Sequence, residues 1–405
     1  MRNEREDVNE MTPGQRVARA RKRKGWTQGD LAAAVDRSAS WVAKVEGGHA
    51  PLDRRSIIDR LAHALGVEVV ELTGQPYRPA TQNMDSGHAA VPALRLALQR
   101  ASLPSFASIE RQPRPLMDLQ RAIAHAEDLR QAANFSPLNS LLPDLIEDLV
   151  VLGRTETGDA AASTAELMVR ACHIARVMAN LTGHHDLAWL AMERELSAAQ
   201  SVGSPVVLAA ASWDLCGAWL HAGAIDEARN VATQAIDTLD GLQGSDAPDI
   251  PAMLGAMHLR AAVAYSRLWS ASDAAAHIAE ARRVVQPSGN AWQTQFNAAN
   301  LAIHEVEIAI ELGRPGDLER QVQSVPVSEI NSGERLSHYW TCKARGLGMS
   351  NKPTEALEAL LKAEQIAGAH VLNRPMARAL IMDLLSRTRR GVHPELRRMA
   401  GLINA

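Results

Sequence analysis

The sequence has few aromatic residues, few cysteines and no long apolar run, and these shortages exclude several classes of protein. Cys172, Cys216 and Cys342 stand far apart without a C-x-x-C pair, which indicates neither a zinc module nor a disulfide framework. A reducing, cytoplasmic location fits best. No stretch approaches the roughly 18 apolar residues of a membrane helix, and the first residues lack the apolar segment of a signal peptide, so we expect no membrane partner.

Motifs that carry catalysis are also missing. His304 and Glu305 begin like a zinc-protease helix, but the second histidine at i+4 is absent. Residues 184–186 (His-His-Asp) fall at a predicted turn, where the aspartate caps the next helix. Gly346 and Gly348 have no third glycine and no preceding strand. We therefore expect no enzyme, no metal site and no cofactor.

Length and charge leave the general class open. At 405 residues the chain is too long for one compact core, so we expect a small domain joined to a larger, repetitive one. The formal net charge is -3, and arginine outnumbers lysine 37 to 6. Charge is informative only locally: residues 11–60 hold eleven basic and five acidic side chains. Such a basic excess on a small domain favours phosphate contact, although a solvated charged face has the same pattern.

Helix signals are clear in this basic region. Thr12 can cap a first helix with Pro13 at its first position and Gln15 completing a capping box, and that helix should end near Lys24. Gly25 follows as a stop signal.

Two further short helices follow. Thr27 caps a helix over about 28–35, with Asp30 at the third position. Ser38 caps another that runs to about Glu46, before the pair Gly47-Gly48. Only three residues separate these two helices, which predicts a helix-turn-helix whose second helix can enter the major groove of DNA.

The residues from Arg16 to Ala32 (RVARARKRKGWTQGDLA) and from Ser38 to Gly48 (SASWVAKVEGG) resemble the Cro-like or xenobiotic-response-element (XRE) helix-turn-helix regulators. The resemblance implies an all-α, five-helix DNA-binding domain over 11–74, completed by helices at about 54–65 and 68–72. It also implies that double-stranded DNA is the partner, which places the protein on the nucleoid when bound.

The same resemblance assigns site residues. Gln28 corresponds to the residue that anchors a backbone phosphate, and Ala39, Ser40 and Lys44 correspond to the positions that face base edges. The expected DNA contacts are Gln28, Arg37, Ser38, Ala39, Ser40, Trp41 and Lys44. Two departures stand out. Asp36 occupies a turn position that is usually glycine, and Ala39 offers no hydrogen bond to a base.

Beyond this domain, prolines scattered over 75–115 predict a linker, with one helix at about 93–101. Residues 116–405 show helical patterning almost throughout, and small residues recur after short turns. The clearest copies are Trp219, Gly223, Ala228 and Ala235, then Tyr265, Ala274 and Ala281, and then Leu347, Ala356 and Ala363. The spacing resembles the tetratricopeptide repeat (TPR) and implies a TPR-like α-solenoid; an irregular helical bundle is the alternative.

We therefore expect a homodimeric, sequence-specific transcriptional regulator whose repeats bind a peptide or small-molecule effector. Tryptophans are the candidate effector contacts: Trp189, Trp219, Trp269, Trp292 and Trp340. One alternative is an adaptor whose repeats dock a partner protein while the helix-turn-helix only localises it to DNA. A second is that the N-terminal domain is a protein module that binds no DNA.

Overall fold

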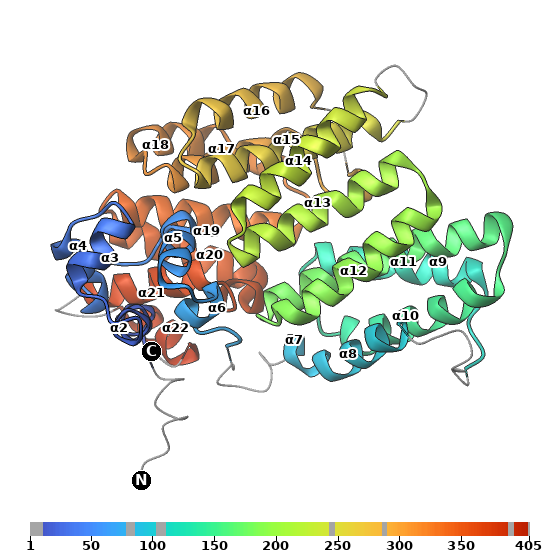
Figure 1. Cartoon of the computed structure of the whole chain (residues 1–405), viewed down its shortest axis with the longest axis horizontal. Helices are drawn as coiled ribbons and strands as arrows, with labels where there is room; N and C mark the ends of the chain where they lie inside the picture. The colour runs from blue at the N-terminus through green and yellow to red at the C-terminus, as the bar shows by residue number, and fades with distance from the viewer. Residues whose placement is uncertain are drawn as a thin grey trace, which may run out of the picture.

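The computed structural model of the protein describes residues 11–77, 86–102, 111–242, 248–285, 290–387 and 393–403. Every regular element in these ranges is a helix, as the all-α expectation requires (Figure 1). None of the described helices is both long and apolar enough to cross a membrane.

The N-terminal domain consists of five helices over the described residues 11–74: α2 (Pro13–Arg23), α3 (Gln28–Ala34), α4 (Ala39–Glu46), α5 (Arg55–Leu65) and α6 (Val69–Thr73). The two expected capping boxes are present, at Thr12 with Gln15 and at Thr27 with Asp30. Asp36 has a φ of 54°, so this aspartate adopts the left-handed turn conformation in place of glycine. The local helix signals in the sequence are thus confirmed.

The rest of the described chain is a succession of helices, most of them longer than those of the N-terminal domain. The first of them are α7 (Ser86–Ala89), α8 (Val91–Arg100), α9 (Leu116–Gln131), α10 (Leu138–Thr155), α11 (Gly158–Leu181), α12 (His185–Val202), α13 (Pro205–Ala222) and α14 (Ile225–Asp240). They are followed by α15 (Ile250–Arg267), α16 (Ala271–Val284), α17 (Ala298–Glu311), α18 (Pro315–Ser324), α19 (Gly333–Met349), α20 (Pro353–Leu372), α21 (Pro375–Arg387) and α22 (Pro394–Leu402).

These helices form two layers. Sequential neighbours pack together as antiparallel pairs, while α11, α13, α15, α17 and α19 contact one another in order and form an inner layer. The inner layer curves back on itself, because α19 also contacts α9. The Arg130 guanidinium on α9 reaches Glu334 on α19 at 2.5 Å, and both side chains are buried. The chain's own charged side chains therefore occupy part of the inner face.

The small residues singled out in the sequence lie where helices of a pair cross. Ala228 on α14, Ala274 and Ala281 on α16, and Ala356 on α20 are each no more than 1% exposed. Gly223, with a φ of 82°, ends α13 in the left-handed conformation that glycine adopts without strain. Alanine at these crossings lets two helices approach closely, which explains the recurrent spacing.

The proline-rich segment contains the helix expected near 93–101, which extends over Val91–Arg100 as α8. Leu94 and Leu98 of this helix are fully buried in a core that includes α10 and α11. On the N-terminal side of that segment, the Tyr77 hydroxyl donates to the Thr73 carbonyl at 2.9 Å, and Arg378 of α21 stacks 3.8 Å from the Tyr77 ring. Tyr77 and α8 within this segment are therefore each packed against other elements.

Candidate nucleic-acid interface

The outward face of α4 is open to solvent. Ala39, Ser40 and Lys44 are exposed on it, while Val42 and Val45 on the opposite face are each 1% exposed. Figure 1 shows α3 and α4 at one end of the molecule, beside the bundle and not beneath it. A helix with a buried apolar back and a small, polar exposed front has the shape needed to enter a major groove.

A buried ion pair fixes α4 against α2. Arg21 donates to both carboxylate oxygens of Glu46, at 2.6 and 2.8 Å, and to the Trp26 carbonyl at 2.7 Å. Burial alone would raise the pKa of Glu46, but hydrogen bonds from Arg21 and Gln28 hold it below its ordinary value. The carboxylate stays charged and joins three helices.

Gln28 lies at the start of α3, as expected, but its amide is already occupied. Its Nε2 donates to the second oxygen of Glu46 at 2.8 Å. In this arrangement the side chain positions α3 relative to α4. Its expected contact with a phosphate remains a prediction.

The turn before α4 carries the remaining predicted contacts. Ser38 caps α4 by accepting from the Trp41 backbone N–H at 3.1 Å. Trp41 is half-buried, and the Arg37 guanidinium lies 5.8 Å from its ring centroid. Arg37 also lies 5.1 Å from the ring of Trp269, on the loop between α15 and α16.

Part of the basic excess of this domain faces the rest of the chain. Arg54 and Arg60 join Arg37 around the Trp269 ring, each 5.6 Å from its centroid. Arg55 is buried and bonds Asp59 at 3.1 Å. Net charge therefore overstates the number of cations available for phosphates, whereas Lys44 is exposed.

The N-terminus of α5 is capped by a residue from α17. Glu311 accepts the backbone N–H groups of Arg55 at 3.4 Å and Ser56 at 3.0 Å. Arg345 on α19 donates to the Asp53 carbonyl at 2.6 Å and to Glu311 at 3.2 Å. A carboxylate at a helix N-terminus satisfies orphan N–H groups and the helix dipole. Sequence analysis missed this contact, because its partners stand 255 residues apart.

The candidate effector tryptophans lie in different places. Trp189 and Trp219 pack edge to face, with centroids 4.6 Å apart. Trp292 packs beside the core formed by α11, α12 and α13. Trp269 lies among the arginines of the N-terminal domain, and Trp340 lines a cavity between α18, α19 and α20. The other four tryptophans do not line that cavity.

Sequence analysis also missed a buried cluster of His173, Glu195 and Asp214, whose ligand atoms lie within 4.8 Å of one another. Such a set resembles a metal site, but Arg176 donates to Asp214. Burial, reinforced by the neighbouring Asp214, raises the pKa of Glu195 well above its ordinary value. Asp214 is thus held by both Arg176 and His173, whereas His173 Nε2 and one carboxylate oxygen of Glu195 are buried without a hydrogen-bond partner among the described residues.

Comparison with known proteins agrees with the geometry of the N-terminal domain. Residues 14–73 match the family model described as a helix-turn-helix domain. The chain thus carries a helix-turn-helix DNA-binding domain on an otherwise helical body. No curated protein and no solved structure matches the sequence.

Proposed function

We propose that the protein is a sequence-specific, double-stranded-DNA-binding transcriptional regulator of the XRE/Cro-like type. The observation that carries this proposal is the exposed face of α4, with Ser40 and Lys44 outward and Val42 and Val45 in the core. The matched helix-turn-helix domain supports it. In this proposal Lys44 contacts a base edge or phosphate, and Arg37, Ser38, Ala39 and Trp41 line the same approach.

We further propose that the chain acts as a homodimer, so that two helices reach two half-sites, and that its TPR-like body binds an effector. The recurrent alanine crossings support the TPR-like interpretation. An effector can regulate only by binding one arrangement of the DNA domains more tightly than another. The contacts of Glu311 and Arg345 with α5 offer a direct connection between the body and the DNA domain.

A variant series tests the DNA-binding proposal. Lys44→Ala should weaken the free energy of binding to the cognate site by on the order of 1 to 3 kcal/mol, or change the DNA sequence that the protein prefers. Gln28→Ala should weaken cognate and random DNA alike. The matched control is Arg121→Ala, since Arg121 is 76% exposed on α9, at the end of the molecule away from α4 (Figure 1).

The measurement is gel retardation of genomic fragments at several salt concentrations, followed by footprinting of the retained sites. Binding should weaken steeply as salt rises, because phosphate contacts release counterions. Failure of the wild-type chain to retard any fragment would show that the domain is a protein module only. A regular spacing of two half-sites would support the dimer.

A further inference from the structure

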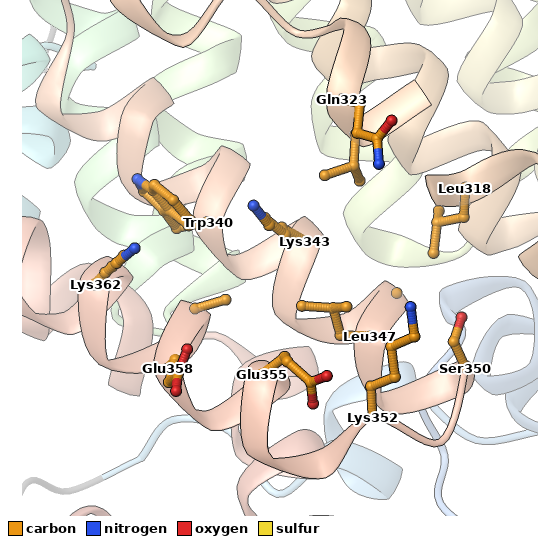
Figure 2. Close-up of a pocket in the computed structure, with 13 residues that line it drawn as sticks. Leu318, Gln323, Trp340, Lys343, Leu347, Ser350, Lys352, Glu355, Glu358 and Lys362 are labelled. Atoms are coloured by element: carbon orange, nitrogen blue, oxygen red, sulfur yellow. The ribbon is translucent and has the colours of Figure 1, made fainter. Parts of the chain in front are cut away.

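Lysine is unusually placed in this chain. Of its six lysines, three lie in the helix-turn-helix domain and the other three, Lys343, Lys352 and Lys362, line one cavity. The cavity lies between α18, α19 and α20 and has a volume of about 340 Å³ (Figure 2). That volume is at the lower end of the range for small-molecule pockets, roughly 300 to 1,000 Å³.

Two of these lysines flank one tryptophan. The ammonium nitrogen of Lys343 lies 4.8 Å from the Trp340 ring centroid, and that of Lys362 lies 4.6 Å away. Burial lowers the pKa of Lys343, and the nearby positive charge of Lys362 lowers it further. Among the described residues, neither lysine forms an ion pair with a carboxylate. The two ammonium groups on this ring repel each other, and an anion bound beside them would relieve that repulsion.

The acidic residues of the cavity do not neutralise it. Glu355 and Glu358 are exposed on α20, and Figure 2 shows them along one side, across from Lys343. Lys362 is exposed like the two glutamates, so solvent screens these three charges, whereas the charge of the half-buried Lys343 is screened less. With three lysines and two glutamates, the cavity lining carries a net positive charge.

Most of the remaining lining is apolar, and the uncharged polar residues Gln323 and Ser350 also border the cavity. Leu318 and Val322 from α18 and Leu347 from α19 face the cavity. Leu318 is 3% exposed and lies against Gly346, where a Cβ atom would come within 2.0 Å of Leu318 Cδ2. The glycine therefore lets Leu318 pack against α19. The cavity combines an apolar wall with a cationic wall.

We propose that this cavity binds a small organic anion, with its carboxylate or phosphate against Lys343 beside the Trp340 ring and a compact apolar body against Leu318 and Leu347. The cation pair selects for negative charge, and the apolar wall selects against small inorganic ions. The assignment of this cavity as the effector site rests on the proposed function. Arg345, two residues after Lys343 on α19, reaches Asp53 and Glu311 and so connects the same helix to the DNA domain.

The test is calorimetric titration of the full chain with benzoate, 1-naphthoate and phenyl phosphate, and with the neutral 1-naphthamide. Saturable binding of at least one anion is expected, with 1-naphthoate about tenfold or more tighter than its amide. The double variant Lys343→Met/Lys362→Met keeps a flexible, unbranched side chain at each position but removes both charges, and it should abolish this preference. Lys22→Met, at an exposed position of α2, is the matched control and should bind like the wild type.

Three results would overturn the proposal: no saturable binding of any anion, equal affinity for naphthoate and its amide, or unchanged naphthoate affinity in the double variant. Circular dichroism of the double variant checks that it folds. DNA retardation is measured separately without any probe. Loss of DNA binding would therefore refute the proposed function without altering the titration result, and the two failures are distinguishable.

Discussion

At the scale of single residues, Gly14 decides how closely α2 approaches α4. A Cβ atom at this position would lie 2.0 Å from the Val45 carbonyl oxygen, which is backbone and cannot rotate away. In most helix positions glycine-to-alanine substitution stabilises by up to about 1 kcal/mol. Here we expect Gly14→Ala to destabilise the domain by about 1 to 3 kcal/mol, as overpacking does. Thermal unfolding together with DNA retardation checks this.

Gly29→Ala provides the matched control, since the Cβ would meet only the Thr27 hydroxyl, at an ordinary 3.5 Å. This variant should be as stable as the wild type or slightly more so. Equal stability of the two alanine variants would show that α2 and α4 are not in tight contact.

The sequence predicts the helix caps but not the hydrogen bonds between residues that are far apart in the chain. The caps at Thr12, Thr27 and Ser38 depend on residues within three positions of each other, so they are visible in the sequence. The bonds of Glu46 to Gln28 and Arg21 join residues 18 and 25 positions apart. Only the fold brings these side chains together, and no local pattern marks them.

At the scale of elements, the contact of Glu311 on α17 with the N-terminus of α5 joins the helical body to the N-terminal domain. Glu311→Gln keeps the shape of the side chain. It leaves a single acceptor oxygen for the three donors on Ser56, Arg55 and Arg345. It also removes the negative charge that faces the N-terminus of the α5 dipole. We expect the free energy of unfolding to fall by about 1 to 3 kcal/mol, because hydrogen bonds to a buried charge would be left incomplete. Thermal unfolding and faster amide exchange at Arg55 and Ser56 measure it.

Glu305→Gln on the same helix is the control for this prediction. Its partner Arg282 is 57% exposed, and an ion pair in water contributes at most about 1 kcal/mol. Amide exchange in α5 should not change in this variant. If it accelerates in both variants alike, Glu311 has no specific role in holding α5.

Periodicity and turn signals predict the existence of helices but not their neighbours. The pairing of α13 with α14 follows from a short turn at Gly223, so the sequence indicates it. The contact of α19 with α9 depends on Arg130 and Glu334, which stand 204 positions apart. The closed inner layer, and the cavity beside Trp340, therefore emerge only in the folded chain.

At the scale of the whole molecule, buried histidines make stability depend on pH. Burial lowers the pKa of His304 to about 4 and that of His185 to about 4, against an ordinary value of 6.5. Both side chains are therefore neutral in the folded chain at pH values where the unfolded chain binds protons. The stability that the two neutral histidines contribute to the folded state is therefore complete above about pH 6.5 and is lost as the pH falls toward 4.

His304→Gln isolates one such contribution. His304 is 8% exposed and its Nδ1 bonds the Asn300 carbonyl at 2.8 Å, an interaction that a glutamine amide can also make. Between about pH 7 and pH 5, the wild type should lose roughly 2 kcal/mol more unfolding free energy than the variant, because only its unfolded state gains the proton. His63→Gln, at an exposed position of α5, should keep the wild-type pH dependence. Urea unfolding between about pH 5 and pH 7 gives the unfolding free energy of all three proteins. If this free energy changes with pH equally in the wild type and in His304→Gln, His304 does not remain neutral in the folded chain.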